Sequence, residues 1–179
     1  MTSRTELVAL ELRDLQATIR HLAPNLPSGI SLRTADPETD LGTIADLYNA
    51  AFEREPSDRI TAEKVAAYAR HPGLGPSGVM LAFDGHLAVG MAVARLEVRA
   101  SGSETRDGSV ELLAVHPAYW GLGLATALTH RALSWLAGQG VKTVSATTDH
   151  PAALAILRRF GFQAVRGEAR PAEHKAAEA

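Results

Sequence analysis

The stretch of residues 110–128 constrains the fold more than any other part of the sequence. It begins as an apolar strand pattern, crosses a short loop, and continues as a helical pattern that opens with Gly121, Gly123 and Ala125. Small residues at alternate positions let the backbone turn tightly and let a ligand approach it closely. The amides of residues 122–126 would then be free donors at a helix N-terminus, where the helix dipole also favours an anion. The pattern therefore predicts a site suited to a pyrophosphate.

Two other interpretations of this stretch have less support. A dinucleotide-binding fold needs a Gly-x-Gly-x-x-Gly fingerprint and an acidic residue on the next strand. Here the third small residue follows after two positions, and no acid stands at the matching place. The second alternative is purely structural, with glycines that only permit a tight strand-to-helix turn.

The rest of the chain has the pattern of short strands and helices. Periodicity and turn residues predict strands at residues 30–34, 79–83, 87–98, 109–115, 141–148 and 162–165. They predict helices after Asp40 and Thr61, over residues 121–136, and from Pro151 to Gly161. Strands mixed with crossover helices indicate a mixed sheet with helices on its faces.

The N-terminal 23 residues predict one further helix. Apolar residues recur there at steps of four and three, at Val8, Leu12, Leu15, Ile19 and Leu22. We expect this helix to pack on its own domain. A two-heptad dimer seam is the alternative, which leaves a homodimer open.

The composition is that of a soluble globular protein, with 46% hydrophobic and 21% charged residues among 179. A net charge of −2 gives no reason to bind nucleic acid or an anionic membrane. The absence of cysteine excludes disulfides, thiolate metal sites and a cysteine nucleophile. No apolar run approaches the roughly 18 residues that a spanning helix needs. The histidines show no ligand spacing, so we expect no metal, and a cytoplasmic location is the default.

Two motifs resemble those of the GNAT superfamily of acyl-CoA-dependent N-acyltransferases. Residues 113–117, Leu-Ala-Val-His-Pro, match the family's Leu-x-Val-x-Pro strand end, and residues 120–125 match its Arg/Gln-x-x-Gly-x-Gly/Ala turn. Residues 150–162 resemble the family's Asn-x-x-Ala-x-x-Leu-Tyr-x-x-x-Gly-Phe helix. The order of the predicted elements from about residue 30 to 165 also fits this family.

The resemblance implies an α/β (α+β) fold with a mixed, mostly antiparallel sheet flanked by helices, here with an extra N-terminal helix. The expected division is an N-terminal helical appendage at residues 1–27, a GNAT-like acyltransferase domain at 28–167, and a flexible tail at 168–179. Acetyl-CoA is the implied co-substrate. The strand at residues 113–115 would hydrogen-bond the pantetheine, and the Leu113 N–H would face the thioester oxygen. The implied coenzyme-binding residues are Leu113, Ala114, Val115, Trp120, Gly121, Leu122, Gly123, Leu124, Ala125, Thr126, His150 and Leu157.

The chain departs from the family pattern at three of these positions. Trp120 replaces the usual Arg or Gln, which removes a polar contact to the pyrophosphate, and His150 replaces the usual Asn. Leu157 replaces the Tyr that commonly protonates the leaving thiolate. Solvent can supply that proton, because a thiol has a pKa of about 8.5 and leaves readily. Asp149 and His150 are expected to cap the last helix, and action of either on the substrate amine is the less favoured alternative. The chain is also short after Phe162, so the family's last strand is expected to be reduced or absent.

Glu111 is the candidate general base. A carboxylate on an otherwise apolar strand needs partners if it is buried. Side-chain alternation predicts that Glu111, Leu113 and Val115 share a face, with Glu111 about 6–7 Å from Leu113. That separation suits a base that acts through one water molecule. An exposed or salt-bridged glutamate with no catalytic part is the equal alternative.

The sequence therefore predicts an N-acetyltransferase that moves an acetyl group from acetyl-CoA to a primary amine by direct attack. The acceptor is a small molecule or peptide, shaped in this family by the loops at residues 53–59 and 99–108. Tyr119 and Trp120 either flank the adenine or pyrophosphate or cover the core. The alternative function is a non-catalytic acyl-CoA-binding module, which the loss of Tyr at Leu157 favours.

Overall fold

The computed structural model describes residues 8–22, 24–70, 77–97 and 106–165. The strands are β1 (Val8–Leu12), β2 (Ile30–Thr34), β3 (Ser77–Asp84), β4 (Leu87–Leu96), β5 (Arg106–Val115), β6 (Val141–Thr148) and β7 (Gln163–Ala164). The α-helices are α1 (Leu15–His21), α2 (Leu41–Ala51), α3 (Ala62–Ala69), α4 (Leu124–Gly138) and α5 (Pro151–Arg159). Two short 3₁₀ turns, η1 (Pro56–Asp58) and η2 (Pro117–Tyr119), lie in the connections. The predicted tail at 168–179 and the loop residues 99–105 lie outside these ranges.

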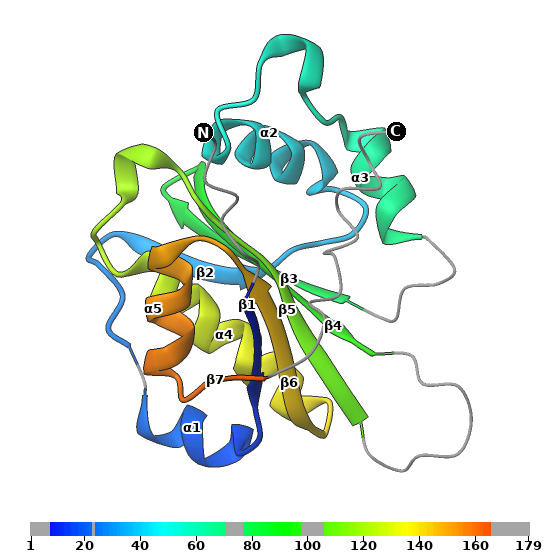
Figure 1. Ribbon diagram of the computed structural model, residues 1–179. Helices are drawn as coiled ribbons and strands as arrows, with labels where there is room; N and C mark the ends of the chain where they lie inside the picture. Colours follow the sequence, from blue (N-terminus) through cyan, green and yellow to red (C-terminus); the bar gives the residue numbers. More distant parts are fainter. Residues whose placement is uncertain (1–7, 23, 71–76, 98–105, 166–179) are drawn as a thin grey trace, which may run out of the picture.

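One sheet of seven strands runs through the described part of the chain in the order β2-β3-β4-β5-β6-β1-β7 (Figure 1). β5 and β6 are parallel neighbours, and the other described neighbours are antiparallel. The α4 crossover joins β5 to β6, as a parallel connection requires. The predicted mixed, mostly antiparallel sheet is therefore confirmed.

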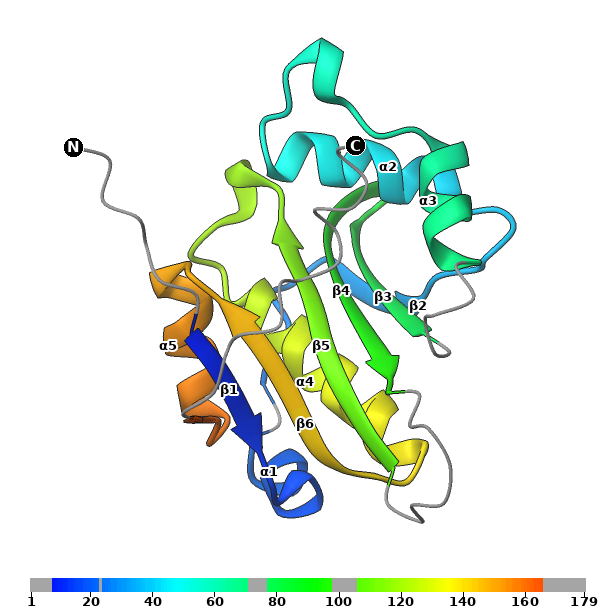
Figure 2. The same ribbon diagram turned by 45° about the vertical axis from the view of Figure 1, so that its right-hand side comes forward.

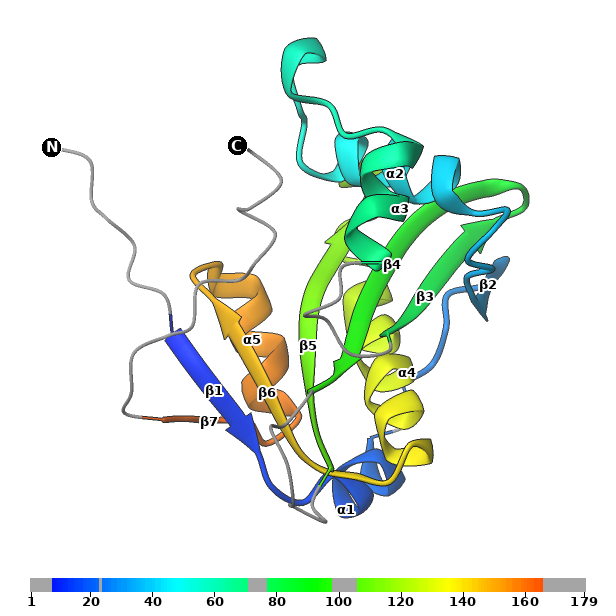
Figure 3. The ribbon, with the colours of Figure 1, turned by 90° about the vertical axis from the view of Figure 1, so that its right-hand side faces the viewer.

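Helices cover both faces of the sheet and enclose two cores (Figure 3). The larger core lies under α4, α5 and α1, with Leu128, Leu133 and Phe160 almost fully buried. The smaller core lies under α2 and α3, where Leu47 and Met91 are buried. Each helix presents an apolar stripe to the sheet and leaves its other side to solvent. None of the helices in the described ranges is long and apolar enough to span a membrane.

The N-terminal helix is shorter than predicted, because its first part is a strand. Residues Val8–Leu12 form β1, which pairs with β6 on one side and with β7 on the other. The expected extra helix is α1, which begins after Asp14, and the Asp14 side chain accepts a hydrogen bond from the Ala17 amide at 3.2 Å. The helical interpretation of residues 8–12 was wrong, since apolar residues at 8, 10 and 12 also fit the period of two.

β5 begins at Arg106, earlier than the sequence predicted. Gly108 and its polar neighbours indicate a loop in the sequence, but in the structure Gly108 lies inside the strand against α4. A Cβ atom at this position would come within 2.6 Å of a Leu136 methyl carbon. Gly108 is therefore required by the close approach of helix and strand, not by a turn.

Asp40 precedes α2, as predicted, but its side chain does not cap the helix. Both carboxylate oxygens accept hydrogen bonds from Arg33 of β2, at 2.5 and 2.8 Å, and Oδ2 also accepts from the Asp36 amide at 2.7 Å. The Arg33 guanidinium is the main reason that the pKa of Asp40 falls to about 2, and burial opposes this shift. These bonds fix the start of α2 to the edge strand β2.

This contact predicts a pH-dependent part of the stability. A carboxyl group whose pKa falls on folding stabilises the folded state above its unfolded pKa, and this contribution disappears as the pH falls through the folded value. We expect Asp40→Asn to lower the free energy of unfolding by about 1 kcal/mol at pH 7, because the partly exposed Arg33 weakens the effect. The variant should then lose less stability than the parent between about pH 4 and pH 2.

Urea titrations at pH 7, 4 and 2.5 measure both effects, with Asp46→Asn as a control on the exposed side of the same helix. Equal losses of stability in the parent and in Asp40→Asn on acidification would contradict the assignment.

Candidate active site

The parallel strands β5 and β6 separate toward their C-terminal ends (Figure 2). Their pairing begins at Arg106 and Val141 and ends at Val110 and Ala146, whereas β5 continues to Val115. On its other side β5 stays paired with β4 as far as Val115. Residues 111–115 therefore have a strand neighbour on one edge and leave the other edge facing the gap.

Two backbone amides of β5 point into this gap. The His116 N–H donates to the Val89 carbonyl of β4 at 2.9 Å. Since N–H groups alternate between the two edges of a strand, those of Leu113 and Val115 point away from β4. They lie beyond the last β5–β6 pair, so the ladder with β6 does not use them. Both residues are among those predicted to hold the pantetheine and the thioester.

A β-bulge at Glu111 changes the face on which this side chain lies. Val93 pairs with Leu112 and Ala94 with Val110, so Glu111 is the extra residue on β5. Leu113 and Val115 pack toward the core under α4, whereas the Glu111 carboxylate reaches Tyr68 of α3. The prediction that Glu111 shares a face with Leu113 and Val115 was wrong, because the bulge interrupts the alternation.

The glycine turn before α4 is open to solvent. α4 begins at Leu124, three residues later than predicted. Gly121 and Gly123 have φ values of 78° and 80°, which are not helical and which residues other than glycine rarely adopt. A Cβ atom on either glycine would meet nothing within 4 Å, and Leu122 between them is exposed. The first intrahelical bond runs from the Ala127 amide to the Gly123 carbonyl. The amides of Leu124, Ala125 and Thr126 thus have no acceptor in the helix.

Side-chain contacts place Tyr119 and Trp120 differently around this turn. The Tyr119 hydroxyl donates to Asp84 at 2.8 Å, and this hydrogen bond is the main cause that raises the Tyr119 pKa. The Trp120 indole N–H donates to the Val115 carbonyl at 2.8 Å, and 64% of Trp120 is exposed. Tyr119 is therefore held toward β3, whereas Trp120 lies at the end of β5 beside the glycine turn.

Three side chains meet at Glu111. Its Oε1 accepts a hydrogen bond from Arg95 Nε of β4 at 2.8 Å, and its Oε2 accepts one from the Tyr68 hydroxyl at 3.2 Å. The Arg95 side chain is 5% exposed and that of Glu111 22%. Burial and the negative charge of Glu111 raise the Tyr68 pKa. Glu111 is thus paired with a cation and is also accessible, so both interpretations of this residue fit the geometry.

The sequence alone did not single out Arg95 or Tyr68. Arg95 on the apolar strand β4 is the signal that was available, because a buried arginine needs an anionic partner. Tyr68 carries no such signal, since it appears in the sequence as one apolar position of α3.

His150 and Leu157 lie on α5. His150 is exposed at the N-cap position but makes no side-chain capping bond, which does not support the predicted capping role. Leu157 is 5% exposed and belongs to the core under α4 and α5. The described residues contain no group of three or more His, Cys, Asp or Glu that could hold a metal ion.

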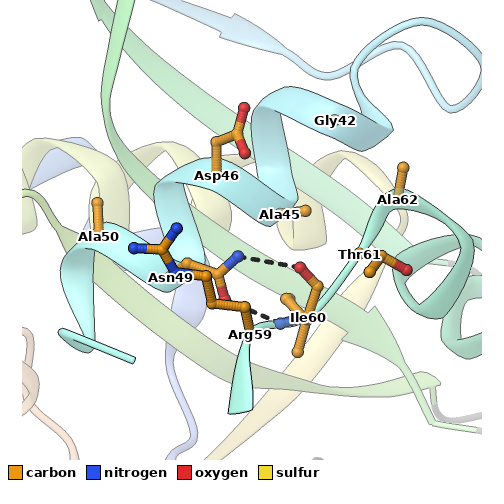
Figure 4. Close-up of a pocket in the computed structure, with 9 residues that line it drawn as sticks. All are labelled: Gly42, Ala45, Asp46, Asn49, Ala50, Arg59, Ile60, Thr61 and Ala62. Carbon is orange, nitrogen blue, oxygen red and sulfur yellow. Dashed lines mark hydrogen bonds between the residues drawn. The ribbon is translucent and has the colours of Figure 1, made fainter. Parts of the chain in front are cut away.

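A hollow of about 530 Å³ lies between α2 and residues 59–62 (Figure 4). The Asn49 amide bonds the Ile60 backbone twice, once as donor and once as acceptor, each at 2.9 Å. These bonds hold the start of α3 against α2. None of the predicted coenzyme-binding or catalytic residues lines the hollow. Arg59, from the first predicted acceptor loop, does line it.

A family model described as the Acetyltransferase (GNAT) family matches residues 41–162. A mycothiol acetyltransferase of Streptomyces coelicolor is 33% identical over 159 residues, which cover 85% of this chain and 50% of that protein. One from Thermobispora bispora is 31% identical, covering 78% and 48%. The chain thus spans about half the length of these curated relatives.

Solved structures show the same fold. A tandem GNAT protein from the clavulanic acid biosynthesis pathway superposes with a TM-score of 0.66 at 19% identity, over 88% of this chain and 50% of that one. An acetyltransferase of Trypanosoma brucei gives 0.62 at 21% identity, over 79% and 97%. The family model covers more than half of the chain, and the predicted resemblance is confirmed. The chain therefore belongs to the acetyltransferase (GNAT) family.

Proposed function

We propose that this protein transfers the acetyl group of acetyl-CoA to a primary amine of a small molecule. One observation carries the proposal: the gap between β5 and β6 opens beside the exposed glycine turn at the start of α4. The β5 amides, which can bind an extended chain of amides, thus lie next to the α4 amides, which can bind an anion. Acetyl-CoA has both features, in its pantetheine arm and its pyrophosphate.

The residues present fit this co-substrate. The amides of Leu124, Ala125 and Thr126 would hold the pyrophosphate at the positive end of the helix dipole. The N–H groups of Leu113 and Val115 would bind the pantetheine arm and the thioester oxygen. Trp120 offers no cation, so main-chain donors supply most of the attraction to the phosphates.

The reaction needs little more than positioning of the two substrates. A neutral amine attacks the thioester carbonyl, and the Leu113 amide stabilises the oxyanion that forms. The amine gives up a proton through a water molecule to the Glu111 carboxylate. The C–S bond then breaks, and the thiolate leaves and takes a proton from solvent, because Leu157 is buried and cannot donate one.

The proposal gives the chemical class of the acceptor, a small molecule with a primary amine. The curated relatives are named as mycothiol acetyltransferases, which supports a small molecule as acceptor. Since this chain spans about half of their length, their particular substrate is not carried over to it.

Release of free thiol from acetyl-CoA across a broad panel of primary amines tests the function. We expect release to depend on the amine and N-acetylated product to form in equal amount. Coenzyme A binding without release for any amine would contradict catalysis. That result would favour the alternative of a non-catalytic acyl-CoA-binding module, which the buried Leu157 supports.

Gly123 provides a test of the anion site. Its φ of 80° lies in the left-handed region, where other residues pay about 1–2 kcal/mol. We expect Gly123→Ala to reshape the turn and to raise the Kd for coenzyme A at least about tenfold, measured by calorimetry. Gly138→Ala, in the last turn of the same helix and with open space around it, is the matched control. Unchanged affinity in Gly123→Ala would argue against binding at this turn.

Glu111 provides a test of the proposed base. We expect Glu111→Gln to lower kcat/KM about 10²-fold, as loss of a general base typically does, while coenzyme A affinity stays constant. The glutamine keeps an oxygen that can accept the Arg95 hydrogen bond. Glu38→Gln, in an exposed turn, is the control. Kinetics equal to those of the parent would remove Glu111 from the mechanism.

A further inference from the structure

The contacts around Glu111 form a closed triangle that joins three elements. Arg95 of β4 and Tyr68 of α3 each donate to a different carboxylate oxygen of Glu111 on β5, at 2.8 and 3.2 Å. The Arg95 guanidinium also lies over the Tyr68 ring, with its carbon 5.1 Å from the ring centre. Each residue therefore limits the rotamers of the other two.

Burial shows which of these contacts is structural and which is adjustable. Arg95 is almost fully buried, so its charge requires the nearby carboxylate. Glu111 is more exposed, and its bond to the Tyr68 hydroxyl is the longer of the two. Arg95 thus fixes one oxygen, whereas the oxygen beside Tyr68 keeps room for a further polar partner, because a carboxylate oxygen accepts more than one hydrogen bond.

The bulge makes this arrangement possible. Without the extra residue, Glu111 would point toward the core under α4, where Leu113 and Val115 pack. With it, the carboxylate lies on the face covered by α2 and α3, where it contacts Arg95 and Tyr68. Glu111 and the Leu113 amide are thus two residues apart along the chain but face different directions.

We propose that Arg95 and Tyr68 are positioning residues that aim the Glu111 carboxylate at the incoming amine. This inference rests on the proposed function. Arg95 keeps Glu111 extended across the sheet face, and Tyr68 sets the direction of the second oxygen. Burial and the charge of Glu111 keep the Tyr68 pKa raised, so the phenol remains a donor. Tyr68 also ties the carboxylate to α3, so the position of that helix affects the reaction.

Tyr68→Phe tests the inference directly. It removes the hydroxyl donor but keeps the ring against Arg95. We expect kcat to fall about tenfold with the KM for acetyl-CoA unchanged. In the Glu111→Gln background the same change should have no further effect, because Tyr68 acts through Glu111. Tyr48→Phe, on the neighbouring helix α2, is the matched control, because it removes a hydroxyl that accepts a hydrogen bond from Arg54.

A merely structural role for Tyr68 would give a drop in kcat that adds to that of Glu111→Gln, and this result would overturn the proposal.

Arg95 is tested by a pair of variants. We expect Arg95→Lys, which keeps the charge, to retain more kcat than Arg95→Gln. Equal kcat in two folded variants would likewise count against a positioning role. If Arg95→Gln does not fold, the comparison of Tyr68→Phe alone and in the Glu111→Gln background still tests the proposal.

A second measurement is independent of turnover. NMR titration of ¹³C-labelled tyrosine, with each signal assigned by its Phe variant, reports the ionisation of Tyr68. We expect the Tyr68 pKa to be lower in Glu111→Gln than in the parent, because the charge that helps to raise it is lost. An identical titration in both proteins would overturn the inference. Failure of every amine to release thiol would instead overturn the proposed function, so the two failures are distinguishable.

Discussion

The proposed site depends on where the pairing between β5 and β6 ends, at Val110 and Ala146. A strand that loses its neighbour exposes a row of unpaired N–H and C=O groups, which is costly unless something else binds them. β1 does not fill this gap, because it pairs with residues 144–148 on the other edge of β6. Beyond Val110, β5 has no described strand on the side of the gap. The amides of β5 that face the gap are therefore available to a ligand.

The two edges and two faces of β5 separate the parts of the proposed reaction. The edge toward the gap carries the amides of Leu113 and Val115, and the strand continues through η2 to the glycine turn that opens α4. The bulge turns Glu111 to the other face, where α3 supplies Tyr68 and β4 supplies Arg95. Co-substrate and acceptor can therefore approach from different directions and meet at Leu113, without competing for the same groups.

Much of this could be predicted from local sequence signals. Gly121, Gly123 and Ala125 predicted the strand–turn–helix unit and the free amides, because φ values and small side chains are local properties. The N-terminal strand was missed because Val8 and Leu12 fit both a helical and an alternating pattern. Only the presence of β6 and β7 on either side, which depends on tertiary structure, decides between them. The side chain of Asp40 was likewise diverted from capping by Arg33, a partner from another element.

The bulge shows most clearly where sequence reasoning stops. Alternation along β5 is a sound expectation for a regular strand, and it places Glu111 beside Leu113 on one face. The extra residue arises from the pairing of Val93 with Leu112 and of Ala94 with Val110, and that register depends on two strands at once. The buried Arg95 on β4 fits the bulged register, because that register brings the Glu111 carboxylate to its guanidinium. The same bulge therefore lets Glu111 neutralise the buried Arg95 and leaves it facing α3, so the charge pairing and the placement of the proposed base depend on one feature of the backbone.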